Sequence, residues 1–171
     1  MKRAYFILIM LCSVICRAQK NSDTLQLSEQ LVIAEVSDKH TASLIIDPDK
    51  LLRAINREFP NKEAEFDAVH LRTAVVNNHT WHYLECTTHT SNRTLVKWLR
   101  NTNGRLDFGQ AEGKAFSLMS TFFICEGEAS CYPRLLFIDG MYGWSCRETS
   151  ACVSDAFAKQ HPCSCTKGRL F

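Results

Sequence analysis

Six of the nine cysteines of this 171-residue chain lie between positions 125 and 165. The same stretch holds the clearest hairpin signal of the sequence, in which the apolar residues 135–138 and 141–144 flank Asp139-Gly140. An Asp-Gly pair between apolar runs favours a two-residue type I′ turn, because both central residues need a positive φ. This part of the chain is therefore predicted to form an antiparallel hairpin surrounded by cysteines.

The predicted hairpin has two unlike faces, because side chains alternate across a strand. The expected core face carries Leu135, Phe137, Tyr142 and Trp144 and continues to Cys146. Cross-strand pairs of aromatic and aliphatic side chains add about 0.2–1 kcal/mol each. We therefore expect Phe137 and Trp144 to be core residues.

Four cysteines flank the hairpin with equal spacing. Cys125 and Cys131 are separated by five residues, and so are Cys146 and Cys152. Two pairings respect this symmetry: two local bridges, or the nested bridges Cys131–Cys146 and Cys125–Cys152. We favour the nested pairing, which needs a bulge or a longer loop, although sequence alone does not determine connectivity.

Three further cysteines remain outside the signal-like segment: Cys86, Cys163 and Cys165. Cys163 and Cys165 are too close in sequence for an easy mutual bond, so one of them is expected to reach Cys86. All seven cysteines are thus candidates for disulfides, and the odd number leaves one thiol over.

Residues 1–18 have the form of a secretory signal peptide. Met1-Lys2-Arg3 is basic, residues 4–15 are almost wholly apolar, and Cys16-Arg17-Ala18 places small residues at the two positions read by a signal peptidase. The apolar stretch is too short to span a membrane. Gln19 directly after the expected cut resembles the exported proteins of Bacteroidota. We predict a bacterial protein that is secreted or periplasmic, where disulfides persist.

The segment after the signal is predicted to contain one domain. Residues 19–30 are expected to be a flexible lead-in, and residues 31–171 a single globular domain whose part 125–165 is cysteine-rich. Removing Lys2, Arg3 and Arg17, with no acid in that segment, changes the formal charge from +2 to −1. No basic run suggests nucleic acid, and no membrane span is expected in the mature chain.

The remaining sequence predicts a mixture of short strands and helices. A helix at residues 47–59 should begin with Asp47 as cap and Pro48 in the first turn. Residues 91–104 fit a helix, which we favour, or a returning strand. The other expected elements are strands at residues 31–36, 43–46, 68–76, 81–90, 105–108 and 115–125, and a helix at 150–160. This order predicts an α+β fold, a mainly antiparallel sheet with two or three helices and a disulfide-stapled C-terminal hairpin.

Four histidines and Cys86 lie within twenty residues of one another. A Cys-His nucleophile needs an activated thiol in contact with a histidine. His82 and Cys86 share a strand face, but four residues along a strand span roughly 13 Å. We therefore favour a buried or bridged Cys86, and keep a small secreted hydrolase using His70, His82 or His89 with an acid as an alternative.

Two other chemistries have candidate residues near the C-terminus. His161, Cys163 and Cys165 could bind zinc or copper, which gives an envelope metal-handling protein as a second alternative. Glu126, Glu128 and Glu148 could act as paired carboxylates, although acids in short disulfide loops are usually solvated. We assign no metal ligand, catalytic residue or cofactor.

Four large aromatic residues remain: Trp81, Tyr83, Trp98 and Trp144. Aromatic side chains dominate binding hot spots and also fill cores, and we favour the core. The sequence as a whole favours an exported, disulfide-stabilised binding domain with a protein or glycan partner, including inhibitor- or immunity-like roles. It favours a non-enzymatic role without excluding an enzyme.

Overall fold

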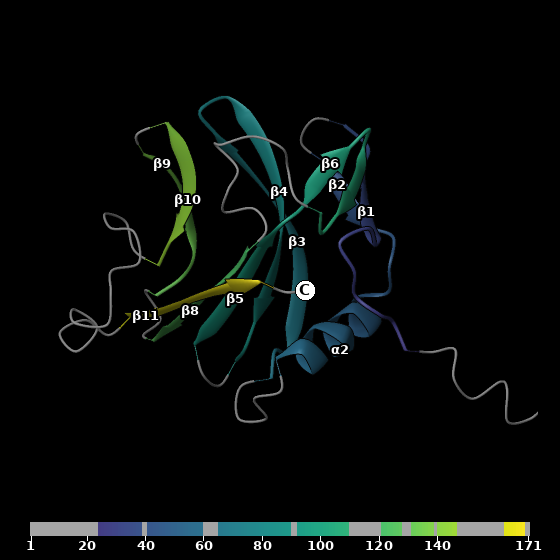
Figure 1. Ribbon diagram of the computed structural model, residues 1–171, viewed down its shortest axis with the longest axis horizontal. Helices are drawn as coiled ribbons and strands as arrows, with labels where there is room; N and C mark the ends of the chain where they lie inside the picture. The colour runs from purple at the N-terminus through teal and green to yellow at the C-terminus, as the bar shows by residue number, and fades with distance from the viewer. Residues whose placement is uncertain are drawn as a thin grey trace, which may run out of the picture.

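The computed structural model describes residues 24–38, 41–59, 65–89, 92–109, 121–127, 131–138, 140–146 and 163–169. Over these residues the chain forms eleven strands and one helix, arranged as three sheets (Figure 1). The signal-like segment 1–18 and the predicted helix at residues 150–160 lie outside the described residues.

Every strand pairing in the described part of the chain is antiparallel. A four-stranded sheet has the order β2 (Ala42–Leu44), β1 (Val32–Val36), β7 (Arg105–Asp107) and β6 (Arg100–Thr102). A five-stranded sheet has the order β11 (Cys163–Arg169), β8 (Thr121–Gly127), β5 (Arg93–Trp98), β4 (His79–Thr87) and β3 (Ala68–Val76). The third sheet is the hairpin of β9 (Arg134–Ile138) and β10 (Met141–Ser145).

The predicted number of helices is wrong for the described residues, which contain α2 (Pro48–Glu58) as their single helix. The helix favoured at residues 91–104 is in fact the two strands β5 and β6. Residues 95–99 are all buried, because the five-stranded sheet is covered on both faces. A strand covered on both faces carries a nearly continuous apolar run, which a helical pattern also fits. Here the run is Leu-Val-Lys-Trp-Leu, with Lys97 as its one polar residue. Over the described residues the fold is therefore mainly antiparallel β with one helix.

Helix α2 begins as the sequence predicted. The Asp47 side chain accepts a hydrogen bond from the Lys50 amide at 2.9 Å, and Pro48 is in the first turn. This cap satisfies one of the amides that a helix start leaves free. Leu51, Ala54 and Ile55 are buried, so the helix lies with its apolar side on the sheets.

Tight turns hold the antiparallel ladders in register. Asn77 and Asn78 both have positive φ, 50° and 60°, between β3 and β4. Gly140, with φ 78°, lies in the turn of the predicted hairpin, where Met141 pairs with Ile138. Tyr142 pairs with Phe137 and Trp144 with Leu135, which is the register that the predicted two-residue Asp-Gly turn requires.

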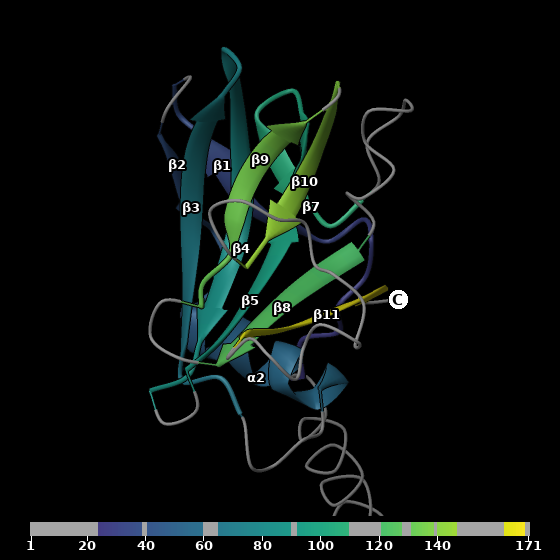
Figure 2. The same cartoon turned by 90° about the vertical axis from the view of Figure 1, so that its left-hand side faces the viewer.

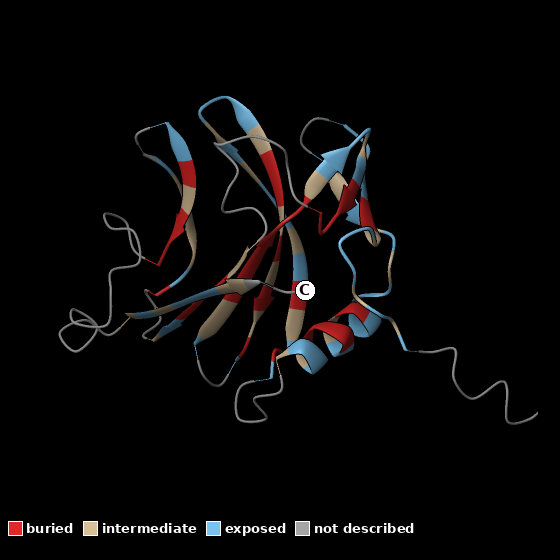
Figure 3. Ribbon diagram, viewed as in Figure 1, coloured by how far each residue is buried: buried red, intermediate tan, exposed pale blue. Residues whose placement is uncertain are grey.

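The five-stranded sheet is the middle layer of the molecule. One face packs against α2 and the four-stranded sheet, through a core that includes Leu51 and Ile55 of the helix and Leu84 and Leu95 of the middle strands. Leu25, from the predicted lead-in, also packs against this core. In Figure 3 buried residues run along the middle strands and the inner side of the helix.

The other face of the five-stranded sheet is covered by the hairpin. The side chains alternate as expected along β4, where Trp81 and Tyr83 face the hairpin while Leu84 and Cys86 face the helix. Trp98, Tyr142 and Trp144 belong to the core on the hairpin side. In Figure 1 the hairpin, the β3–β4–β5 strands and the β1–β2–β6 strands follow one another across the molecule.

Candidate functional site

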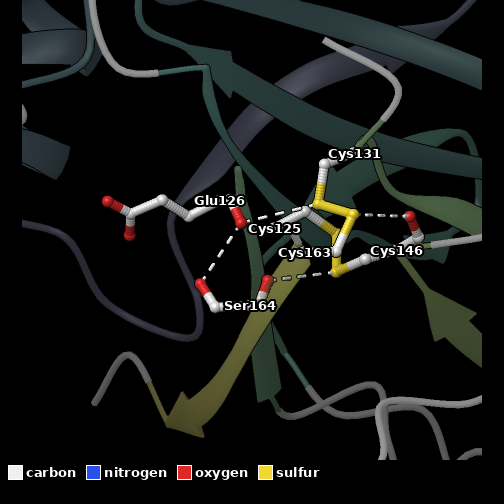
Figure 4. Close-up of a disulfide and its surroundings, with 6 residues drawn as sticks. All are labelled: Cys125, Glu126, Cys131, Cys146, Cys163 and Ser164. Carbon is white, nitrogen blue, oxygen red and sulfur yellow. Dashed lines mark hydrogen bonds between the residues drawn. A yellow bond between two sulfur atoms is a disulfide. The ribbon is translucent and has the colours of Figure 1, made fainter. Parts of the chain in front are cut away.

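Two disulfides join the hairpin region to the five-stranded sheet (Figure 4). Cys125 of β8 bonds Cys146, which follows β10, and Cys131, which precedes β9, bonds Cys163 of β11. Neither the local nor the nested pairing predicted from the spacing is found. The equal spacing relates only residues that flank the hairpin, whereas β11, from the end of the chain, lies alongside β8.

The predicted link from Cys86 to the C-terminal strand is also wrong. Cys86 is a free thiol and is buried in the helix-side core. Cys163 bonds Cys131, and Cys165 is disulfide-bonded as well. Because Cys86 points to the face opposite the disulfides, it cannot reach them without turning its strand over.

The strand pairing of β8 and β11 sets the positions of the two disulfides. Cys165 pairs with Cys125, and Cys163 with Gly127, in the β8–β11 ladder. The Ser164 hydroxyl donates a hydrogen bond to the Glu126 carbonyl at 3.2 Å. Both ends of the hairpin are thus attached covalently to neighbouring strands, so the hairpin is held in place on the sheet.

The large aromatic residues between hairpin and sheet form a packed core. The ring centroids of Trp98 and Trp144 are 4.8 Å apart, those of Tyr83 and Trp144 are 4.9 Å apart, and those of Trp81 and Tyr142 are 4.5 Å apart. The three tryptophans are buried. As predicted, Trp144 is a core residue, and these side chains do not form an exposed binding face.

Phe137 departs from the prediction, because 40% of it is exposed. Its ring packs on Tyr142, with centroids 4.6 Å apart, and the ring of His79 lies 6.1 Å from Tyr142 on the turn side of β4. We call the surface formed by Phe137, Tyr142, His79 and Val76 the hairpin shelf. It lies where the β9–β10 hairpin approaches the β3–β4 turn. Beneath it is the buried aromatic core, and the side chains of Phe137 and His79 are exposed at the surface.

Within the described residues the histidines do not form the acid-paired site of the hydrolase alternative. His82 is buried, its Nδ1 lies 3.0 Å from the Thr73 hydroxyl, and burial lowers its pKa. Glu85 lies opposite His70 in the β3–β4 ladder, but its carboxylate forms an ion pair with Arg72, with Oε2 2.7 Å from Nε. The Cys86 thiol also fits poorly with nucleophilic chemistry, since burial raises its pKa.

The backbone amide of His89 donates to the Asp67 carboxylate at 2.7 Å. This carboxylate therefore has a structural role at the end of β4. Glu126 is exposed and lies 3.9 Å from Arg93 Nε. Glu128 and Glu148, the other acids of the paired-carboxylate hypothesis, lie outside the described residues.

The two cysteine sulfur atoms of the metal-binding alternative are oxidised in this structure. Cys163 and Cys165 are both disulfide-bonded, and His161 lies outside the described residues. The described residues bring together no group of three or more metal-ligating side chains. A disulfide sulfur is not a thiolate ligand, so metal binding here would require reduction first.

A buried lysine lies at the junction of the two larger sheets. Lys97 is 1% exposed, and burial lowers its pKa to about 8. The negative charges of Glu29 and Asp107 raise the pKa and so offset part of this effect. Asp107 accepts two hydrogen bonds from Arg100, each 3.0 Å long, and one from the Gly109 amide. These groups join β5, β6 and β7, so we assign them to the scaffold.

No family model, curated protein or solved structure matches the chain. The described residues include no helix that is long and apolar enough to cross a membrane. Among the described features, the hairpin shelf combines exposed rings with a rigid support, and it is our candidate functional site. The sequence pattern did not predict this site, because alternation places Phe137 on the same strand face as residues that are buried in the core.

Proposed function

We propose that this protein is an exported, disulfide-stabilised binding domain that engages a protein partner outside the cell or at the cell envelope. The observation that carries the proposal is the exposed ring of Phe137 on Tyr142, held over a packed and covalently attached core. Exposed aromatic side chains on a rigid support are typical anchors of protein interfaces. Inhibitor- and immunity-like roles fall within this proposal.

The rigid attachment of the hairpin supports a binding role for the exposed ring of Phe137. A surface that is already ordered loses little conformational entropy when a partner binds. Both ends of the hairpin are bonded to the five-stranded sheet through Cys146 and Cys131. The shelf therefore presents the same shape before and after binding.

Export is the second part of the proposal. It rests on the signal-like residues 1–18, and the disulfides fit an oxidising compartment. The mature chain should begin at or near Gln19, which intact-mass measurement of protein from its native host would establish. A cytoplasmic pool retaining Met1 would contradict export.

The binding proposal is tested by capture from native envelope extract with the oxidised mature protein and two variants. Phe137→Ser removes the exposed ring of the shelf. Ile45→Ser, the matched control, removes an apolar side chain that is 52% exposed after β2 in the four-stranded sheet. The account predicts a partner protein retained by the parent and by Ile45→Ser and lost by Phe137→Ser.

Equal retention by the parent and Phe137→Ser would contradict the assignment of the shelf. Retention of a glycan with no protein would contradict the class of partner. Each variant should first be shown to melt like the parent, so that a loss of binding reflects the surface rather than unfolding.

A further inference from the structure

The outer edge of β10 carries main-chain groups that point away from β9. Ile138 and Met141 form the pair that closes the two-residue turn, and Leu136 pairs with Gly143. The pair that closes such a turn is hydrogen-bonded, and hydrogen-bonded and non-hydrogen-bonded pairs then alternate along an antiparallel ladder. The amides and carbonyls of Tyr142 and Trp144 are therefore directed to the outer edge.

This edge is unpaired within the part of the chain that the structure describes. β9 is the one described strand that pairs with β10, and the two strands lie side by side in Figure 2 as a separate hairpin. The main-chain hydrogen bonds outside the ladders include none from Tyr142 or Trp144 over the described ranges. A free edge of this kind is a template for another strand.

The other described edges carry protection that β10 lacks. Proteins guard free edges with charged side chains, proline or very short strands. β3 carries His70 and Arg72, β9 carries Arg134, β11 carries Lys167, and β2 and β6 have three residues each. β10 reads Met-Tyr-Gly-Trp-Ser, with no charge and no proline.

We propose that β10 pairs antiparallel with β10 of a second copy of this chain, about a two-fold axis at Gly143. In that register Tyr142 lies opposite the partner's Trp144, and Trp144 opposite the partner's Tyr142. Both are hydrogen-bonded pairs, so the outward amides and carbonyls of all four residues are satisfied. The edge is complementary to itself, which is the requirement for a closed two-fold dimer.

Glycine at the axis leaves the closest approach in this register free of side chains. Gly143 and the partner's Gly143 form the intervening non-hydrogen-bonded pair, where Cα atoms approach to about 4.5 Å. With no side chain at this point, the two strands meet without a collision. The two hairpins become one four-stranded sheet, and sheets of three or more strands are more stable than an isolated hairpin.

Cysteine cross-linking tests the register. Gly143→Cys places two cysteines across the axis, with Cβ atoms about 4.5–5.5 Å apart, close enough for a disulfide after small adjustment. Met141→Cys, the matched control, is on the same hairpin face and is 57% exposed in the parent. Its two copies would lie four residues out of register, roughly 13 Å apart. We expect a covalent dimer from Gly143→Cys and none from Met141→Cys.

A measurement on the parent keeps the proposal testable if Gly143→Cys folds poorly. Sedimentation of the oxidised mature chain should give a dimer, and exchange of the Tyr142 and Trp144 amides should accelerate on dilution. A monomer at every concentration, with exchange independent of dilution, would overturn the proposal, as would equal cross-linking of the two cysteine variants. Phe137→Ser should still dimerise, so failure of the dimer and failure of the binding shelf are distinguishable.

Discussion

Cys125 of β8 is bonded to Cys146, which directly follows β10, with their Cα atoms 5.5 Å apart and their positions 21 apart in sequence. The bond joins the middle layer of the molecule to the hairpin that covers it. Between the two layers lie Trp98 and Trp144, whose packing depends on the hairpin staying in place. Covalent and apolar contacts thus stabilise the same interface.

Removal of this disulfide should destabilise the domain. Closing a loop of this length restricts the unfolded chain and adds about 3 kcal/mol. The double variant Cys125→Ala/Cys146→Ala, which leaves no new thiol, should lose about that much free energy of unfolding in urea titration. The pair Cys131→Ala/Cys163→Ala closes a longer loop, 32 residues, and should lose as much or slightly more. If both double variants unfolded at the same urea concentration as the parent, the two disulfides would be contradicted.

Trp144 and Phe137 should respond differently to truncation although they share a hairpin face. Trp144 is 6% exposed and Phe137 is 40% exposed. Trp144→Ala should cost about 3–5 kcal/mol, as for other buried aromatic residues, and Phe137→Ala about 1 kcal/mol or less. Thermal melts of the two variants would decide this, and similar losses would place Phe137 in the core after all.

Local chemistry in the sequence predicts much of the fold. The cap at Asp47 and the positive-φ turns at Asn77-Asn78 and Gly140 depend on neighbouring residues alone, so pattern reasoning finds them. The helix expected at residues 91–104 is wrong, because burial of β5 on both faces depends on the hairpin and on α2 together. That information is tertiary, and a short apolar run does not contain it.

Gly109 lies directly against the side chain of Arg100. A Cβ atom there would overlap the guanidinium, only 2.7 Å from Nε, and displace it from the Asp107 carboxylate. Gly109→Ala should therefore cost about 1 kcal/mol or less, because the guanidinium is the movable end of a side chain and its ion pair with Asp107 is partly exposed. In an Arg100→Ala background the same change should be close to neutral. Additive losses in this double-mutant cycle would contradict the contact.

Lys97 should make stability depend on pH. Burial lowers its pKa from 10.5 to about 8, so between these pH values the unfolded chain binds more protons than the folded one. The contribution of Lys97 to the free energy of unfolding therefore rises as the pH increases through this window. Lys97→Met should match or exceed the parent at neutral pH, because an apolar group avoids the desolvation cost.

The difference between Lys97→Met and the parent should shrink as the pH rises above about 8. Urea titrations of both proteins across this range would measure it, and comparison of the pair cancels the titration of other groups. A difference that stays constant with pH would show that Lys97 does not titrate in this way.

The candidate site was harder to predict than the fold. Alternation assigns Phe137 to the same face as Tyr142 and Trp144, but it does not reveal that the hairpin tip extends past the packed core. The equal gaps of the pairs Cys125/Cys131 and Cys146/Cys152 suggested a pairing within one hairpin. The actual partner of Cys131 is Cys163 of β11, and that contact depends on strand order, which spacing does not encode.

The most direct test of the stapled arrangement is disulfide mapping of the oxidised protein, with alkylation of the denatured chain before any reduction. The account predicts linked peptides for Cys125 with Cys146 and for Cys131 with Cys163, and alkylation of Cys86. A Cys125–Cys131 link, or a disulfide at Cys86, would contradict the stapled arrangement on which the hairpin shelf depends.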